Sequence, residues 1–528
     1  MTSTFSFRDL LPSFLAGAML LLASLANFID YNAYPYLRPE IGLIAFGALA
    51  IAALMASFYL GQRQWGRSFL EGLLVALFID LNSTSLTIAV AGGFAVAAFA
   101  WWRRTSLLAP LAVVGGVILV TTVLGIRGPS TWIRVANADQ APPASHSSRP
   151  PILHMMLDEH LGIEGFNQLG GAGKEVGDEL RRNYVADGFA VYGGAYSEHM
   201  RTVNSLPHIF NFGRKSDNTA SKRGGKLGST EYLKRLSQAG YRIKVLQSDY
   251  EDICTDNPVA ECITYDSSSL GPTLIAPVTT GQRVTMIMSK FVQLSDIAAI
   301  ATGSWNAASV RMGRLGLPFR QLNVKDAGRS SSIAAVVAFD DAIKSLTEAR
   351  PGDVYLLHML LPHYPYVVDR HCRPLPWEEW KLRHRTVTMK ERHLGYFEQV
   401  RCTTQMVHRA VAAFESANPN RSIIIVHGDH GSRITDMEPV EENLGRFGDA
   451  DMIAGYSTLF AVRAPQIKPG YDRRRQPINW LLHDLVETEF RSAPQIIPSR
   501  VDGVFIDDHR YWIPRRKIPL PKTWPATQ

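Results

Sequence analysis

The chain has 528 residues and a formal net charge of +7, from 55 basic and 48 acidic side chains. This length excludes a single ordinary hydrophobic core, so we expect more than one structural unit. Charge is spread unevenly, because residues 1–125 contain six arginines, five acidic residues and no lysine, whereas the remainder resembles an ordinary soluble domain.

The first 125 residues contain apolar stretches typical of a membrane domain. Leu10–Ile29 and Ile41–Leu60 are each 20 residues long without a charge, which is enough to span a hydrocarbon core of about 30 Å. Two further spans are expected at Leu86–Trp102 and Leu107–Gly125. A weaker span at Trp65–Leu81 has acidic residues towards both ends of a short apolar centre.

The number of spans decides on which side of the membrane the C-terminal part lies. With five spans, the loop arginines share one side, which the positive-inside rule makes the cytoplasm. These arginines are Arg8, Arg63, Arg67, Arg103 and Arg104. With four spans, these arginines no longer share one side of the membrane. We therefore expect five spans and a C-terminal domain outside the membrane. The first segment is too long for a cleaved signal and lacks a clear small-residue cleavage site.

Residues 126–150 form a predicted linker, since 141–151 is rich in Pro and Ser and cannot hold a regular element. All four cysteines follow it. An even number in an exported domain favours two disulfides, most simply Cys254–Cys262 and Cys372–Cys402. Four unrelated buried thiols are the alternative.

From Ile152 onwards apolar strands alternate with helical stretches, which predicts an α/β domain with a mainly parallel sheet flanked by helices. The expected strands are Ile152–Leu157, Phe189–Tyr192, Tyr241–Leu246, Asp353–Leu361, Ile423–Val426 and Thr458–Val462. The expected helices are Lys174–Asp187, Thr230–Ala239, Ser331–Thr347 and Gln399–Ser416.

Three of these strands lead into residues that can bind metals. The first ends in Asp158 and Glu159, the second leads to His363, and the third ends in Asp429 and His430 between two glycines that let the backbone turn sharply. Strand ends far apart in sequence meet at one edge of a parallel sheet. Singly, such residues are more often helix caps or buried histidines, but together they predict a site for Zn²⁺ or a related metal.

Segment 198–211 offers two hydroxyls, Thr202 and Ser205, just before a predicted helix. A hydroxyl at a divalent metal loses its proton more readily and becomes a nucleophile at neutral pH. A helix N-terminus also favours the anionic group that would be attacked. For this segment alone, an ordinary Ser/Thr helix cap is the simpler interpretation.

These motifs resemble the sulfatase and alkaline phosphatase superfamily, in particular its membrane-anchored phosphoethanolamine and phosphoglycerol transferases. The resemblance covers about residues 150–515. It is carried by Leu157-Asp158-Glu159, Thr202 in Thr-Val-Asn-Ser-Leu-Pro, Pro362-His363-Tyr364-Pro365 and Gly428-Asp429-His430-Gly431. It implies an alkaline-phosphatase-like fold and a divalent metal, Zn²⁺ first, with Mn²⁺, Mg²⁺ or Ca²⁺ as alternatives.

The resemblance also implies roles for individual residues. Asp429 and His430 would hold the metal with Glu159, Asp158 or both. Thr202 would be the metal-bound nucleophile that takes the phospho group covalently. His363 would contact the phosphate, bind a second metal or protonate the leaving group.

Departures from the family pattern leave alternatives open. The transferases usually carry the hydroxyl where Met200 stands here, so Ser205 is a second candidate nucleophile. Residues 432–456 contain no histidine, which leaves one metal better supported than two and makes Arg433 a candidate for the missing positive charge. A sulfatase would need Cys/Ser-x-Pro-x-Arg, and Ile209 stands in place of that arginine.

The expected organisation is an α-helical membrane domain (1–125), a linker (126–150), a catalytic domain (151–515) and a basic, Pro-rich tail (516–528). The resemblance implies transfer or hydrolysis of a phospho group at a bacterial inner membrane, with the catalytic domain facing the periplasm. A membrane lipid would be donor or acceptor, and an envelope glycan or lipid the substrate. The alternatives are a sulfuric ester hydrolase and a non-catalytic sulfatase-like lipid sensor.

Two basic runs, 473–475 and 515–517, are interpreted first as solvated faces. The second lies beside Trp512 and Trp524, so a surface resting on anionic lipid headgroups is the alternative. A nucleic-acid partner is excluded by the expected location outside the cytoplasm. The sequence does not determine the oligomeric state.

Overall fold

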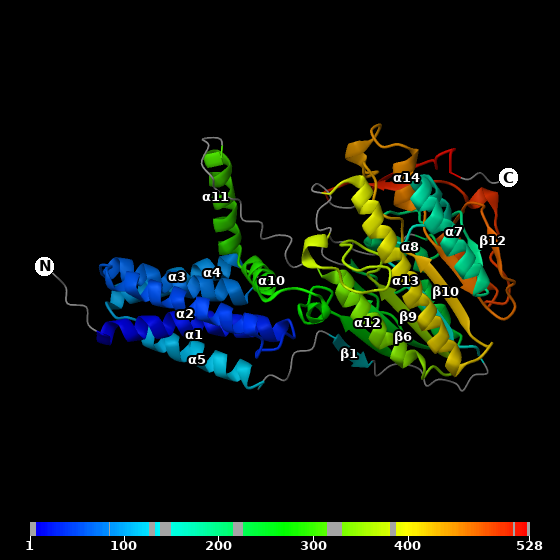
Figure 1. The fold of residues 1–528 in the computed structure, drawn as a ribbon. Coiled ribbons are helices and arrows are strands. Elements are labelled where there is room, and N and C mark those ends of the chain that lie inside the picture. Colours follow the sequence, from blue (N-terminus) through cyan, green and yellow to red (C-terminus); the bar gives the residue numbers. More distant parts are fainter. Residues whose placement is uncertain are drawn as a thin grey trace. The chain divides into compact units, whose positions relative to one another are not determined.

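The computed structural model describes residues 7–83, 85–125, 133–137, 149–214, 225–313, 330–380, 387–510 and 513–524. The chain divides into two compact units (Figure 1). One comprises Met1–Trp132 and Ser269–Arg329, and the other Ile133–Ser268 and Ser330–Gln528. Most of the expected linker lies outside the described residues. Residues 269–329 lie inside the expected catalytic segment but group with the N-terminal helices. The expected domain boundaries remain a prediction.

The first unit is helical throughout its described residues. Its elements are α1 (Phe7–Tyr31), α2 (Pro39–Leu60), α3 (Gln64–Asn82), α4 (Leu86–Arg103), α5 (Leu108–Val123), the 3-10 helix η2 (Gly271–Ile275), α10 (Thr280–Gln293) and α11 (Asp296–Gly313). Three stretches, Leu10–Tyr31, Pro39–Leu60 and Leu86–Arg103, are long and apolar enough to cross a membrane. The other two expected spans fall on α3, which carries internal charges, and on the shorter α5.

Helix α3 is held by close packing and by a buried carboxylate. A methyl group added to Gly72 would lie 2.4 Å from the carbonyl oxygen of Gly93 in α4, so these small residues let the two helices approach closely. Glu71 is buried and accepts hydrogen bonds from the Tyr59 hydroxyl at 2.7 Å and the Leu107 amide at 3.0 Å. The acidic residue that weakens α3 as a membrane span is therefore satisfied inside the protein.

The second unit is built on a nine-stranded sheet in the order β1-β8-β6-β9-β2-β10-β11-β3-β12. The bounds are β1 (Ile133–Asn137), β2 (Ile152–Leu157), β3 (Ala190–Tyr192), β6 (Arg242–Ser248), β8 (Glu261–Tyr265), β9 (Asp353–Met359), β10 (Ile423–Gly428), β11 (Phe460–Arg463) and β12 (Gly470–Asp472). The central strands β8, β6, β9, β2 and β10 are parallel. β1 is antiparallel to β8, and β11 is antiparallel to β10 and β3, so the sheet is mixed.

The central strands are covered on both faces by helices. Every residue of β2, β9 and β10 is buried, which explains their almost continuous apolar sequences. Helices α8 (Thr202–Phe210), α9 (Glu231–Gln238) and α15 (Ile478–Glu487) contribute to one core with the sheet. On the other face, α12 (Ser331–Leu346) and α13 (Met389–Ala417) pack together and lie with α7 (Gly170–Ala186) along the front of the sheet in Figure 1.

The remaining elements connect and flank these layers. The helices of the second unit are α6 (Ile163–Phe166), α7 (Gly170–Ala186), α8 (Thr202–Phe210), α9 (Glu231–Gln238), α12 (Ser331–Leu346), α13 (Met389–Ala417), α14 (Asp449–Tyr456) and α15 (Ile478–Glu487). The 3-10 helices are η1 (Asn167–Leu169), η3 (Trp377–Glu379), η4 (Glu441–Asn443) and η5 (Pro498–Arg500). The short strands are β4 (Ala195–Tyr196), β5 (Gly225–Lys226), β7 (Glu251–Asp252), β13 (Gln476–Pro477), β14 (Val504–Asp507) and β15 (Pro514–Ile518).

The basic runs are tied into the fold. Arg473 pairs with Glu164 at 2.8 Å, and Arg516 pairs with Glu441 at 2.5 Å. Further ion pairs join Arg474 to Asp472, Arg515 to Asp508 and Lys517 to Asp502. Trp524 is fully buried. These pairings favour an ordinary folded surface over one that rests on lipid headgroups.

Both expected disulfides are confirmed. Cys254 is bonded to Cys262 and Cys372 to Cys402, and no cysteine is free. The second bond attaches the loop after β9 to helix α13, which covers the sheet.

We predict that peptide mapping under non-reducing conditions will recover the pairs 254–262 and 372–402. The sequence separations are 8 and 30 residues. Because a longer closed loop restricts the unfolded chain more, the double variant Cys372→Ser/Cys402→Ser should lose about 2–4 kcal/mol of stability, more than Cys254→Ser/Cys262→Ser. Alkylation of all four thiols without prior reduction would contradict both pairings.

Candidate metal centre and active site

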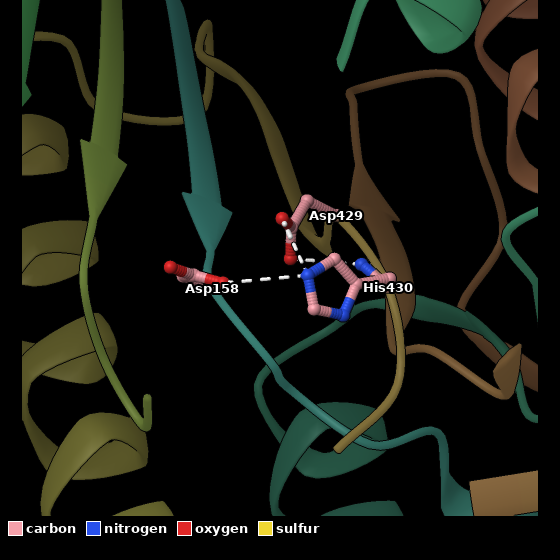
Figure 2. Close-up of side chains that lie close together, drawn as sticks. All are labelled: Asp158, Asp429 and His430. Carbon is pink, nitrogen blue, oxygen red and sulfur yellow. Dashed lines mark hydrogen bonds and ion pairs between the residues drawn. The ribbon is translucent and has the colours of Figure 1, made fainter. Parts of the chain in front are cut away.

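Two adjacent parallel strands bring Asp158 and Asp429 together. β2 and β10 are paired in register up to Leu157 opposite Gly428, so the next residue of each strand lies at the same level at the carboxyl edge of the sheet. Neighbouring strands are about 4.8 Å apart. One ligand atom from each of Asp158, Asp429 and His430 lies within 4.8 Å of the others, and all three residues are buried (Figure 2).

His430 presents an acceptor nitrogen to both carboxylates. Its Nδ1 lies 2.7 Å from the carbonyl oxygen of Gly431, and because a carbonyl can only accept, Nδ1 carries the proton. Nε2 lies 3.6 Å from Asp158 Oδ1 and 3.3 Å from Asp429 Oδ2 (Figure 2). Burial lowers the pKa of His430, which favours the neutral ring. A neutral imidazole held by a backbone carbonyl is the usual form of a histidine metal ligand.

The two aspartates carry more negative charge than the protein balances. Asp429 Oδ1 accepts the amide protons of Glu159 at 3.1 Å and His430 at 2.8 Å, whereas Oδ2 is buried without a hydrogen-bond partner. Burial, and then the charge of Asp429, raise the pKa of Asp158 well above its ordinary value. Buried uncompensated carboxylates are unfavourable by several kcal/mol, and a divalent cation would remove this penalty. These residues therefore fit a divalent metal.

Helix α8 places Thr202 at the same cluster. Thr202 is its first residue, and the hydroxyl oxygen lies 3.4 Å from Asp158 Oδ1 and 3.3 Å from His430 Nε2. Ser205, one turn later, donates its hydroxyl proton to the carbonyl oxygen of Asp429 and lies 2.8 Å from the hydroxyl of Ser197. The structure thus brings Thr202 to the three ligands and gives Ser205 a contact with the backbone behind them.

Glu159 and His363 form a second group beside the first. Glu159 Oε1 accepts a hydrogen bond from Arg433 Nε at 2.5 Å and lies 3.5 Å from His363 Nε2. Burial acts to raise the pKa of Glu159, but the charges of Arg433 and His363 outweigh it and lower this pKa to about 2. Among the described residues, Glu159 is not part of the three-residue cluster.

Gly428 and Gly431 are required for close packing. The backbone bends at Asp429 and His430 between them, but neither glycine adopts a positive φ angle, so the bend does not use the left-handed conformation that favours glycine. A methyl group on Gly428 would lie 2.3 Å from Thr458 Oγ1 and 2.6 Å from the His160 carbonyl oxygen. One on Gly431 would lie 2.1 Å from the Ala454 carbonyl oxygen. Neighbouring loops at Gly428 and helix α14 at Gly431 therefore press directly against the backbone on both sides of the ligands.

Sequence reasoning missed two contributions to the site, Tyr250 and Glu251, and gave no separate role to His358 of the strand that leads to His363. The chain after β6 brings Tyr250 and Glu251 near Asp158: the charge of Asp158 acts on Tyr250, and the charge of Glu251 acts on Asp158. Burial raises the pKa of Glu251 to about 8. His358, the last but one residue of β9, is fully buried with neither ring nitrogen hydrogen-bonded, and burial lowers its pKa to about 4. A polar group at the carboxyl end of one more parallel strand was the signal available for Tyr250 and Glu251.

We predict that Gly431→Ala will lower the free energy of unfolding by about 1–3 kcal/mol, because the new methyl group collides with backbone atoms. Gly171→Ala in α7 is the matched control, since a methyl group there meets nothing within 4 Å and a helical alanine is favourable. Thermal unfolding of the full chain in detergent measures both. Equal midpoints for the two variants would contradict the close contact at Gly431.

We also predict a pH-dependent difference between the wild type and Glu251→Gln. The raised pKa of about 8 means that the folded state favours protonated Glu251. The wild type should therefore lose stability relative to the variant as pH rises from the ordinary value towards 8, by about 1.4 kcal/mol per unit. Glu175→Gln, an exposed site in α7, controls for the lost charge. A difference that does not change with pH would contradict this burial effect.

Comparisons with known proteins were made by sequence and by structure. No family model matches the chain, and no curated protein matches it significantly. Solved structures do match. They include the C-terminal periplasmic domain of EcEptC from Escherichia coli, at 14% identity over 74% of this chain and 96% of that chain, with a TM-score of 0.40.

Two further matches are a protein in the alkaline phosphatase superfamily from Vibrio parahaemolyticus and the lipoteichoic acid synthase LtaP from Listeria monocytogenes. The first has 12% identity over 70% of this chain and 75% of that chain, with a TM-score of 0.38. The second has 12% identity over 69% and 77%, with a TM-score of 0.36. At these scores we base the functional proposal on the site geometry.

Proposed function

We propose that this protein is a membrane-anchored, metal-dependent enzyme that transfers or hydrolyses a phospho group of the phosphoethanolamine or phosphoglycerol type. The observation that carries the proposal is the position of the Thr202 hydroxyl, 3.3 Å from His430 Nε2 and 3.4 Å from Asp158 Oδ1. A hydroxyl beside two buried carboxylates and a neutral imidazole is suited to nucleophilic catalysis.

Asp158, Asp429 and His430 would hold the metal. Two carboxylates and one imidazole suit Zn²⁺, with Mn²⁺, Mg²⁺ or Ca²⁺ as alternatives. When bound, a divalent metal lowers the pKa of a hydroxyl at its site and attracts anionic phosphate oxygens. The buried, unpartnered Oδ2 of Asp429 supports this assignment.

Thr202 and its helix prepare the first half of the reaction. Thr202 donates a hydrogen bond to Asp158 Oδ1, which orients the hydroxyl oxygen. The positive end of the α8 dipole lies at the same residue and favours an anionic phosphate there. The Thr202 hydroxyl loses its proton to solvent, and attack by its oxygen on phosphorus forms one P–O bond and breaks the bond to the leaving alcohol.

His363 is the candidate proton donor to that leaving alcohol. Its Nδ1 donates to the carbonyl oxygen of Tyr364, which fixes the ring, and its side chain is 28% exposed, so a departing group can reach it. Burial lowers the pKa of His363, so it is the protonated fraction of the ring that can protonate the leaving oxygen from Nε2. In the second half, a water or acceptor hydroxyl attacks the phosphorus bound to Thr202 and returns a proton to His363, and the released Thr202 oxygen takes its proton from solvent.

The membrane anchor suits a lipid substrate. A phospholipid donor or lipid acceptor is held in the bilayer, so tethering the catalytic unit there raises its local concentration. Five spans, with α3 and α5 added to the three apolar helices, would place the second unit in the periplasm of a bacterial inner membrane. The two disulfides support an oxidising compartment. An envelope glycan or lipid is the proposed substrate.

We predict that Thr202→Ala and Asp429→Asn will each reduce hydrolysis of a chromogenic phosphodiester by about 10³-fold or more, since nucleophile and ligands act as one unit. Thr202→Ser, which keeps the hydroxyl, should retain measurable activity. Chelation should remove the activity, and added Zn²⁺ should restore it. Equal rates for the wild type and both inactive variants would refute the proposal.

Mass spectrometry of the peptide spanning 198–211 separates the remaining alternatives. After brief reaction with substrate, we expect Thr202 to carry the transferred phospho group, with the alcohol that remains esterified to it, and Ser205 to be unmodified. Formylglycine at position 205 would instead establish a sulfatase. An inactive protein without stoichiometric metal would establish the sensor interpretation.

A further inference from the structure

The backbone of Glu159 is fixed on both sides by the active site. Glu159 has a φ angle of 62°, a left-handed conformation that a residue with a side chain adopts only where its surroundings enforce it. Its amide donates to Asp429 Oδ1 at 3.1 Å, and its carbonyl accepts from the Tyr396 hydroxyl at 2.7 Å. The direction of its side chain is therefore determined by the fold.

The carboxylate of Glu159 contacts the side chains of Arg433 and His363. Its Oε1 lies 2.5 Å from Arg433 Nε and 3.5 Å from His363 Nε2, and only 2% of the side chain is exposed. The second oxygen, Oε2, is buried without a hydrogen-bond partner, so the carboxylate can accept a further hydrogen bond. The amide and carbonyl of Glu159 thus support the metal-ligand strand ends, while its carboxylate contacts a different part of the site.

Arg433 is placed to bind an anion that enters the site. Its side chain is 28% exposed, so a substrate can reach it, and it lies within the electrostatic influence of Asp158. A guanidinium has five N–H donors, and the bond to Glu159 uses the one on Nε. The terminal NH₂ groups of an arginine match the spacing of two phosphate oxygens.

We propose that Arg433, held by Glu159, is the second cation of the active site and binds a non-bridging oxygen of the phospho group. Glu159 is then the counter-ion of this guanidinium and not a metal ligand, in contrast to the sequence expectation. The inference rests on the proposed function and adds to it a substrate-binding residue.

Metal content separates the two roles of the acidic residues without reference to activity. Full-length Glu159→Gln and Asp429→Asn are purified in detergent, and bound metal is measured by inductively coupled plasma mass spectrometry. We expect Glu159→Gln to keep the wild-type stoichiometry and Asp429→Asn to lose it. Loss of metal from both variants would overturn the assignment of Glu159 as a counter-ion.

Substrate kinetics test Arg433. In metal-replete Arg433→Gln we expect kcat/KM for a phosphodiester to fall by about 100-fold or more, and the inhibition constant for inorganic phosphate to rise. Arg433→Lys should recover only part of the loss, because a single ammonium group cannot donate the two parallel hydrogen bonds that a guanidinium donates. Arg446→Gln, an exposed position, controls for the lost charge and should leave both constants unchanged.

The outcomes distinguish this inference from the proposed function. A wild type that turns over no phosphodiester would refute the proposed function. A wild type that is active, with Arg433→Gln within threefold of it, would refute only the role of Arg433. Restoration of Arg433→Ala activity by millimolar guanidinium, with unchanged thermal stability, would separate anion binding from a structural role.

Discussion

The in-register pairing of β2 with β10 is the constraint on which the candidate site depends. Because Leu157 lies opposite Gly428, the next residue on each strand is an aspartate, and two carboxylates meet at the buried edge of the sheet. Moving either strand by one residue would turn one of them to the other face. His430, the residue after Asp429, and the Thr202 hydroxyl lie against these carboxylates.

The surrounding structure keeps an unfavourable arrangement in place. Every residue of β2, β9 and β10 is buried, so the rigid apolar centre of the sheet holds the charged ends that follow it. Buried charges rarely stabilise a protein on balance, which is why such a cluster points to function. A metal that binds only the folded state would in turn contribute to stability by mass action.

Part of the sheet and of the candidate site could be predicted from the sequence. Parallel strands buried on both faces appear as short continuous apolar runs that end in recognisable polar residues. Asp158, Asp429 and His430 were found in this way, and the disulfide pairs followed from the even number and position of the cysteines. The antiparallel direction of β11 was not predictable, since an apolar run carries no direction. The same holds for residues 269–329, whose grouping with the N-terminal helices depends on tertiary contacts.

The partners of individual side chains were the least predictable part of the site. Glu159 directly follows Asp158, yet its left-handed backbone turns its carboxylate to Arg433 and His363. Gly428 and Gly431 are needed because other parts of the chain press against them, a contact that no local pattern indicates. Tyr250 and Glu251 reach the site from a strand end whose sequence has no metal-ligand motif.

The central claim is that Asp158, Asp429 and His430 hold one divalent metal beside Thr202. Anomalous X-ray diffraction from crystals of the metal-replete protein, collected on both sides of the absorption edge of its metal, tests this most directly. The account predicts one strong anomalous peak in contact with these three side chains and none between Glu159 and Arg433. A peak coordinated by Glu159, or the absence of any peak at the three ligands, would contradict it.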